Sequence, residues 1–512
     1  MVRRLSVLAT LWLGGVVGTA AAQADPSPLL ALVPDDAVAV VVVAAPVPLQ
    51  RALAALVEPL PAELPDELRA QVGLGLVALR RALGGPVGAW LEGVAGGGAV
   101  LAWRPAATGP RWWGALRPTD AAAAAAFCDA RLPGVRRTLR DGLLVLGDDT
   151  AATTGRWPRT DLAARAAVTV GAVAAVDLAA LRDRFGGAAL ARQDARTFAL
   201  APIVHALQHA DWLQLQWTAA GDRTELVATA AAAWPQATVV PVAAGAPSFE
   251  VLAALQLDRD VAALLREPER WLDADGVQAV RSFLSIADGL DGPRSSFVDD
   301  LVAQLPAPWS LHVLAASPGD ADDDAPPIEL PEFVLSAAVA DERAVAVALR
   351  AAGLLATIAN AERAQRGQAP FLVRTCRDEQ GHGLCAEPPP WRGPGAPPTE
   401  QGLSPTLWYG GGRLALASTQ RAARLVCSAA ALPGNGPGDR LVLCGPLLAR
   451  AITANRDVLA LARMLDEGED AAVAQRFVAT FAAVADAIAG VEVAVTQDGA
   501  ATRIALTAER RR

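Results

Sequence analysis

"LQLQWTAAGDRTELVATA" (213–230) and "VEVAVTQDGAATRIALTA" (491–508) agree position by position when they are overlaid at an offset of 278 without a gap. At this offset Leu213 meets Val491, and the glycine in the middle of each stretch meets its counterpart. Apolar and polar side chains alternate on both sides of the glycine, which is typical of a β-hairpin with one buried face. The agreement predicts that one structural unit occurs twice in this chain.

Further paired segments occur in the same order in both halves of the chain. Each half opens with an apolar, strand-like run, followed by a helical stretch. Neighbouring strands without a helix between them indicate antiparallel pairing. The predicted fold class is α+β, with two tandem copies of a mixed, mainly antiparallel sheet packed with helices. The paired segments are 36–46 with 248–257, 89–105 with 308–320, 110–130 with 331–351, 141–152 with 411–423, and 169–181 with 438–451.

The length of 512 residues is too great for a single hydrophobic core and suits two or three domains. We expect a first α+β repeat over 25–235, a linker over 236–247 and a second repeat over 248–512. The second repeat contains a proline-rich insertion around 386–405, which predicts a surface loop because proline cannot join the interior of a helix or a sheet ladder.

Residues 1–24 have the pattern of a secretory signal peptide. Two arginines precede an apolar run, and Ala22-Gln23-Ala24 forms a small-x-small cleavage site. No later run of about 18 apolar residues lacks charges, so we expect no membrane span after the signal peptide is removed. The predicted location is the periplasm or the extracellular space.

Composition excludes several classes of function. The net charge is −9, and all 45 basic residues are arginine. Without lysine, P-loop, Schiff-base and Ser–Lys mechanisms are impossible. An acidic chain without a basic stripe is also a poor nucleic-acid binder, because attraction to phosphate dominates that affinity. We therefore expect no nucleic-acid partner.

Two histidines, His205 and His209, stand four residues apart and would share one face of a helix, as a zinc pair does. The spacing resembles the inverted zinc-peptidase motif His-x-x-Glu-His, but Gln208 occupies the glutamate position and cannot accept a proton from water. At the offset of 278, both histidines meet alanines. They are weak metal candidates, and we predict no metal, no cofactor and no catalytic residue.

Cysteine spacing predicts disulfides in an exported chain. Cys376 and Cys385 flank a turn-forming Gly-His-Gly, and their spacing favours a disulfide over a zinc site. Cys427 and Cys444 are candidates for a second bridge. Cys128 has no partner close in sequence and is expected to be a buried thiol.

The opening of the mature chain, "LVPDDAVAVVVV" (32–43), resembles a family of uncharacterised secreted bacterial proteins. Their chains open with a Leu-x-Pro-x-Asp-Ala phrase before an apolar strand and repeat that unit. The resemblance implies a duplicated α+β fold and no particular activity.

Three hypotheses for function follow. The first is an exported, non-catalytic binding or scaffolding protein whose ligand or partner is unknown, because no polar constellation suggests catalysis. The second is a periplasmic carrier of a hydrophobic ligand or lipid, since 13 tryptophans and a half-buried sheet could form an apolar groove. The third is a metal-dependent hydrolase that uses His205 and His209. The expected partner is thus a protein or a hydrophobic small molecule.

Overall fold

The computed structural model forms two compact units. The first comprises 1–190, 206–232 and 499–512, and the second comprises 191–205 and 233–498. The signal peptide, the linker and His205 lie outside the residues that the structure describes. These residues are 27–31, 33–34, 37–43, 98–104, 111–131, 136–146, 172–185, 208–220, 223–230, 250–270, 272, 274–290, 295–316, 329–389, 403–429, 438–498 and 501–510.

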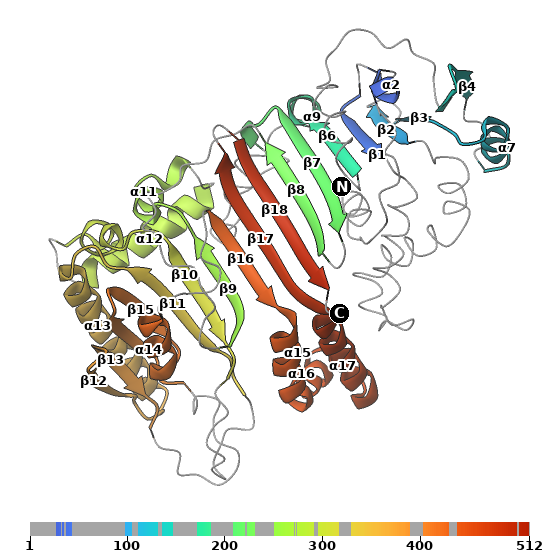
Figure 1. The fold of residues 1–512 in the computed structure, drawn as a ribbon. Coiled ribbons are helices and arrows are strands. Elements are labelled where there is room, and N and C mark those ends of the chain that lie inside the picture. The colour runs from blue at the N-terminus through green and yellow to red at the C-terminus, as the bar shows by residue number, and fades with distance from the viewer. Residues whose placement is uncertain are drawn as a thin grey trace. The chain divides into compact units, whose positions relative to one another are not determined.

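The first unit contains an antiparallel sheet (Figure 1). Its described strands follow the order β4-β5-β3-β2-β1-β6-β7-β8-β18. The strands are β1 (Ala39–Val43), β2 (Ala99–Arg104), β3 (Arg111–Leu116), β4 (Arg137–Arg140), β5 (Leu143–Leu146), β6 (Ala172–Asp177), β7 (Trp212–Ala220), β8 (Arg223–Ala230) and β18 (Ala501–Arg510). The helices are α2 (Ser27–Leu30), α7 (Ala121–Arg131) and α9 (Leu178–Phe185).

Alternation of side chains builds the core of the first unit. In β1, Val40 and Val42 are fully buried, whereas the residues between them are partly exposed. These valines pack with residues that include Val100 and Val173 on the neighbouring strands. At the end of β6, the buried Asp177 accepts a hydrogen bond from the backbone N–H of Ala180 (2.8 Å), which satisfies a free donor at the start of α9.

The second unit contains another antiparallel sheet, in which β16, β9, β10 and β11 lie side by side (Figure 1). Its described strands follow the order β12-β13-β14-β15-β11-β10-β9-β16-β17. The strands are β9 (Val251–Leu257), β10 (Trp309–Leu314), β11 (Glu332–Ala338), β12 (Leu372–Asp378), β13 (Gly381–Glu387), β14 (Thr406–Gly410), β15 (Arg413–Ala417), β16 (Asp439–Cys444) and β17 (Ile488–Asp498).

Helices of the second unit begin at side chains suited to helix starts. Asp260, Thr419 and Asp470 each accept a hydrogen bond from a backbone N–H three residues later. The helical elements are α11 (Val261–Arg266), η4 (Pro268–Arg270), α12 (Ala274–Leu290), η5 (Phe297–Leu301), η6 (Val302–Gln304), α13 (Arg343–Gln365), α14 (Gln420–Ser428), α15 (Gly445–Ala454), α16 (Arg456–Glu467) and α17 (Ala471–Ala487). The predicted α+β class is confirmed, and the pairings between the described strands listed above are antiparallel.

The sheet of the second unit has two distinct faces. We call the face that carries Ala254, His312 and Val334 the inner face, because its side chains are buried. The face that carries Leu255 and Leu335 is the outer face, and most of its side chains are partly or largely exposed. In β9 and β10 the two kinds of position alternate strictly. The strand period of two therefore assigns each residue to one face.

Helices cover the two faces unequally. On the inner face, α14 packs Ala422 and Val426 against residues that include Trp408 and Val334. On the outer face, the first part of α13 and the segment η5–η6 pack against Ala337 and one end of the sheet. Other parts of the outer face stay open to solvent, which makes it the candidate surface for function.

A buried ion pair ties β9 to β16. The guanidinium of Arg259, which is 1% exposed, donates two hydrogen bonds to one carboxylate oxygen of Asp439 (2.7 and 2.5 Å). The other carboxylate oxygen accepts the backbone N–H of Asp258 (2.8 Å). Two buried charges held in this way depend strongly on each other, because removal of one leaves the other uncompensated in a medium of low polarity.

We predict that Asp439→Ala lowers the free energy of unfolding by about 3–5 kcal/mol, because the buried guanidinium loses its carboxylate. Urea denaturation followed by circular dichroism measures this change. The control is Glu269→Ala, which breaks an ion pair with Arg281. Both of these side chains are more than half exposed, so solvent screens the pair and its loss should change the stability much less. Equal losses in the two variants would contradict the prediction.

Candidate functional site

A row of leucines crosses the sheet of the second unit on its outer face. Seven neighbouring strands each contribute one leucine, and each leucine lies directly opposite the next. We call this set the leucine row. In strand order from β13 to β16, its members are Leu384, Leu407, Leu416, Leu335, Leu311, Leu255 and Leu441. Val493 of β17 continues the row beyond Leu441. Directly opposite side chains share a face, so the row is continuous.

The row is long and chemically uniform. Adjacent strands are spaced by about 4.8 Å, so the six steps between seven strands span about 29 Å. One leaflet of a bilayer contributes about half of a hydrocarbon core that is about 30 Å thick. The row is therefore long enough to lie along an extended acyl chain. It contains only aliphatic side chains, and it has no group that could donate a proton or attack a substrate.

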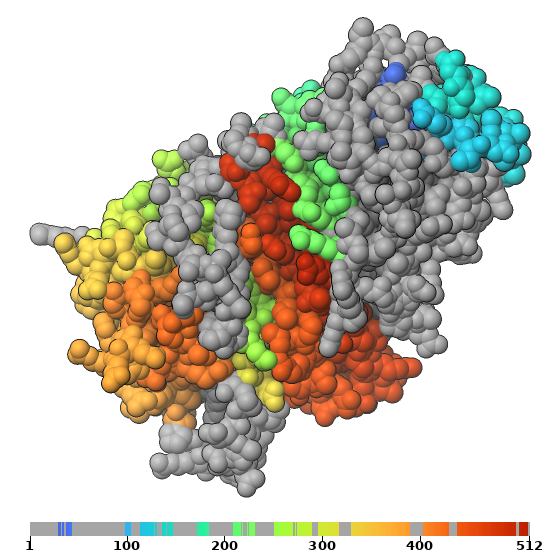
Figure 2. Space-filling model, in the orientation of Figure 1, coloured from blue at the N-terminus to red at the C-terminus, as the bar shows by residue number. Residues whose placement is uncertain are grey.

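The middle of the row is open to solvent. Leu416 is 54% exposed and Leu335 is 38% exposed, and Phe333, on the same face of β11, is 50% exposed. Residues of β16 and β17, coloured orange to red, reach the surface in the view of Figure 2. Full burial of a leucine side chain is worth about 1.5–3 kcal/mol, so this region would gain stability by being covered.

Helix α13 lies over the adjacent part of the outer face. Ala344 and Ala348 in its first turns pack near Ala337, and its Gly353 approaches the side chain of Leu384 in the row. In the described part of the chain, α13 is the one helix that is long and apolar enough to cross a membrane. Of the most apolar 18-residue stretch of this helix, 22% is buried.

Tyr409, the single tyrosine of the chain, fixes the start of α13 over this face. Its hydroxyl donates a hydrogen bond to Glu342 (2.9 Å), which directly precedes the helix. Burial raises the pKa of Tyr409, and the hydrogen bond to the carboxylate raises the pKa further. The phenol therefore stays neutral and remains a donor.

The first unit contains a row built in the same way, but its side chains are smaller. This row runs from β5 to β7 through Leu146, Gly114, Leu101, Val41, Ala174 and Leu215. A Cβ atom on Gly114 would lie 3.2 Å from the side chain of Leu101, so Leu101 fills the space at the glycine. The uninterrupted run of leucines is a property of the second unit.

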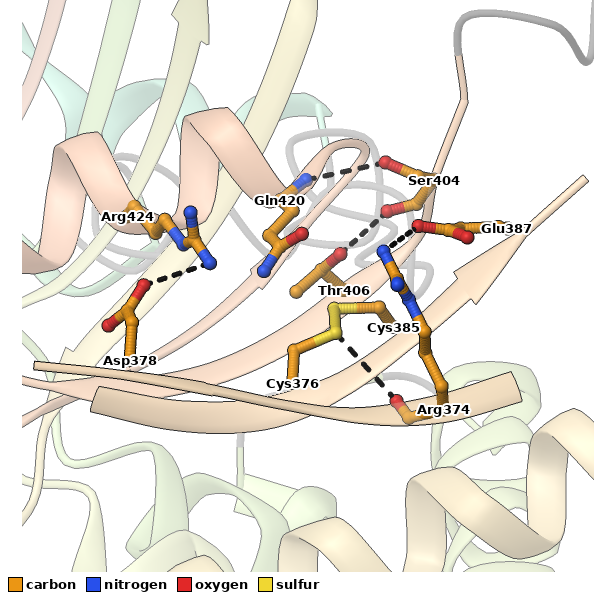
Figure 3. Close-up of a disulfide and its surroundings, with 9 residues drawn as sticks. All are labelled: Arg374, Cys376, Asp378, Cys385, Glu387, Ser404, Thr406, Gln420 and Arg424. Carbon is orange, nitrogen blue, oxygen red and sulfur yellow. Dashed lines mark hydrogen bonds and ion pairs between the residues drawn. A yellow bond between two sulfur atoms is a disulfide. The ribbon is translucent and has the colours of Figure 1, made fainter. Parts of the chain in front are cut away.

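The structure joins Cys376 to Cys385 in a disulfide between β12 and β13 (Figure 3). Both cysteines point to the inner face, where they pack against α14. Ion pairs flank them: Arg374 pairs with Glu387, and Asp378 pairs with Arg424 of α14 (2.8 Å). The bridge predicted from the spacing of these cysteines is therefore present, and its role in the fold is to fasten an edge hairpin.

The other candidate bridge is not formed. Cys427 and Cys444 are both free thiols. Cys427 is a buried residue of α14 and donates a weak hydrogen bond to the backbone carbonyl of Arg413 (3.7 Å), whereas Cys444 lies at the end of β16. Proximity in sequence order suggested the pair, but the two cysteines belong to different elements. Cys128 is a buried free thiol, as expected.

The histidine pair has only one described member. His209 is exposed, and His205 lies outside the described residues. Among the residues that can be described, no group of three or more His, Cys, Asp or Glu side chains could hold a metal ion. The catalytic alternative based on these histidines stays a hypothesis without structural support.

No protein-family model, curated protein or solved structure matches this chain.

Sequence reasoning did not identify the leucine row. Each strand contributes one leucine to it, and strands adjacent in space can be far apart in sequence, as are Leu255 and Leu441. The alternation within single strands was a usable signal, but only the register of the pairs converts it into a row.

We predict that replacing both Cys376 and Cys385 by alanine lowers the free energy of unfolding by about 2–3 kcal/mol. The two cysteines are nine residues apart in the sequence, and the bridge between them closes a short loop. Without the bridge, the unfolded chain gains conformational entropy, which favours unfolding. Urea denaturation without reductant measures the effect. Reductant should destabilise the wild-type protein similarly and leave the double variant unchanged; a wild-type protein insensitive to reductant would contradict the prediction.

We predict that Cys427 resists alkylation in the folded protein. Burial raises the pKa of Cys427 to about 12, and the nearby Arg413 lowers it only partly, so at about pH 8 roughly one thiol in ten thousand is ionised. Iodoacetamide labelling with mass-spectrometric mapping should modify Cys444 at least about 100-fold faster than Cys427. Equal rates would show that Cys427 is accessible and ionised.

Proposed function

We propose that this protein is an exported, non-catalytic binding protein that holds an elongated aliphatic ligand, such as the acyl chain of a fatty acid or lipid, on the leucine row. The observation that carries the proposal is the continuous line of seven leucines with Leu416 and Leu335 exposed at its centre. Large exposed apolar surfaces on soluble proteins mark interaction sites.

The chemistry of the row favours an aliphatic chain over a polar ligand. Leucine side chains make no hydrogen bonds, so recognition depends on contact area and on the removal of apolar surface from water. A ligand that lay across several strands would cover Leu416, Leu335 and Leu311 together. Binding and release of such a ligand need no reaction, which supports a carrier rather than an enzyme.

Export is the second part of the proposal. The signal-peptide pattern of 1–24 indicates passage through the secretory route. The disulfide between Cys376 and Cys385 supports this, since disulfides persist mainly in oxidising compartments. A periplasmic or extracellular binding protein for an apolar ligand is consistent with both features.

We also propose that the two units arose by duplication of one sequence segment. The order β4-β5-β3-β2-β1-β6-β7 in the first unit corresponds to β14-β15-β11-β10-β9-β16-β17 in the second. The second unit differs by the added hairpin β12–β13. A shared order of seven strands supports a common origin of the two sheets.

The strand registers support the same proposal independently. Leu213 lies opposite Val176 in the first unit, and Val491 lies opposite Leu443 in the second. The overlay of 213–230 on 491–508 pairs Leu213 with Val491, so the aligned residues hold the same place in each ladder. The segments 110–130 and 331–351 likewise place residue 114 and residue 335 in the two rows described above.

We predict that the double substitution Leu335→Asp and Leu416→Asp weakens binding of a fluorescent long-chain fatty acid by roughly 100-fold. Two leucine contacts worth about 1.5 kcal/mol each are lost, and about 1.4 kcal/mol corresponds to a factor of ten. Both positions are partly exposed, so the aspartates can remain hydrated and the fold should persist. Fluorescence titration of the purified protein measures the affinity.

The matched control is Leu465→Asp, which makes the same substitution at a leucine of α16 that is 76% exposed and lies off the row. This variant should bind the probe like the wild-type protein. The proposal fails if the wild-type protein does not bind the fatty acid, or if the control loses affinity as much as the row variant.

A further inference from the structure

Polar side chains form a second row on the inner face of the same strands. Ser336 of β11 lies opposite Ser310 of β10, Ser310 lies opposite Gln256 of β9, and Gln256 lies opposite Arg440 of β16. We call these four residues the polar row. His312 follows on the same face of β10. The two serines, the glutamine and the histidine are each at most 3% exposed.

The serine hydroxyls of the polar row are buried without hydrogen-bond partners among the described residues. The Oγ atoms of Ser310 and Ser336 have no such bond, although both side chains are more than nine-tenths buried. A buried hydroxyl without a partner destabilises a fold, because it loses its hydrogen bonds to water. Two of them on directly opposite residues point to a shared guest that bonds to both.

The first unit shows that this sheet position does not require polar residues. The places of Ser336, Ser310, Gln256 and Arg440 are held there by apolar residues that are at most 1% exposed. They are Ala115, Val100, Val42 and Val173, which lie opposite one another in the same order. The place of His312 is held by Ala102. Five buried positions are therefore apolar in the sheet of the first unit, and the matching five positions are polar in the sheet of the second unit.

The difference in polarity between the two units indicates that the polar residues of the second unit have a role beyond folding. Alanine and valine fill these places in the first unit, and they would be the stable choice in a buried layer. Five polar residues at the same places impose a cost on folding unless they have partners. This comparison uses the proposed duplication to match the two sheets, but the site is separate from the leucine row, which lies on the other face.

Charge limits the kind of guest. The charged member of the polar row, Arg440, is already paired with Glu492 (3.0 Å). Gln256 uses its amide N–H to bond the backbone carbonyl of Gly438 (3.2 Å). Because both serine hydroxyls are neutral and each can donate and accept, an uncharged hydroxyl group would match them.

We propose that the polar row of the second unit binds a small uncharged guest with hydroxyl-type hydrogen bonding, either water or a small alcohol or polyol. The guest bridges the hydroxyls of Ser310 and Ser336, and it donates to one and accepts from the other. Water usually fills such buried polar places in proteins. A larger guest would make the row a second ligand site of this protein.

The test replaces the two serines with the residues of the first unit, as Ser310→Val and Ser336→Ala in the full-length chain. If a guest bridges the hydroxyls, the double variant loses those bonds, and its urea midpoint falls by about 0.5–1 M. If the hydroxyls are simply buried without partners, their removal raises the midpoint, and the proposal is overturned. An unchanged midpoint would also overturn it.

Ser428→Ala, at an exposed serine of α14, is the control for the ordinary effect of losing a hydroxyl. Ser336→Ala alone is the milder variant to use if the double variant does not fold. Its urea midpoint should likewise fall if a guest bridges the hydroxyls and rise if the hydroxyl has no partner.

Native mass spectrometry distinguishes the two sources of the guest. Extra mass on the wild-type protein that the variant lacks identifies an alcohol or polyol, and a destabilised variant without a mass difference identifies water. These readouts do not depend on fatty-acid binding, so the polar row and the leucine row can fail separately.

Discussion

In an antiparallel sheet, side chains that lie directly opposite each other must point to the same face. The rest of this structure depends on that constraint. It collects one leucine from each of seven strands into a single line on the outer face of the second unit, although these strands are scattered between Leu255 and Leu441 in the sequence. It also collects Ser336, Ser310 and Gln256 into a line on the inner face. A slip of one residue in the pair β11–β10, β10–β9 or β9–β16 would exchange the two faces and interrupt both rows.

Parts of both faces of the second unit depart from the usual distribution of polarity. A sheet with one exposed face normally carries polar residues toward solvent and apolar residues toward the core. Here Leu416 and Phe333 are exposed, whereas His312 and Ser310 are among the most buried side chains. Such an arrangement is costly for a protein that only needs to fold. It is understandable if the outer face is covered by an apolar ligand for part of the time and the inner face holds a polar guest.

Some of this architecture could be predicted from the sequence, and the reason is local periodicity. Alternation around the two glycines of the overlaid stretches predicted the hairpins, and the absence of helices between neighbouring strands predicted antiparallel pairing. The short spacing between Cys376 and Cys385 predicted their disulfide. The pairing of Cys427 with Cys444 failed because nearness along the chain does not determine which elements meet in space. The leucine row could not be predicted for the same reason, since it exists only after distant strands have found their register.

We propose the outer face of the second unit as a binding surface for an aliphatic chain. The most direct measurement is photo-crosslinking with a long-chain fatty acid that carries a diazirine in its tail, followed by peptide mapping with mass spectrometry. We expect the label to concentrate on peptides that contain Leu335, Leu416 and Leu311, and excess unlabelled fatty acid to prevent this labelling. Label spread evenly over both units, or located on α16 and α17 instead of these strands, would show that the leucine row does not bind the acyl chain.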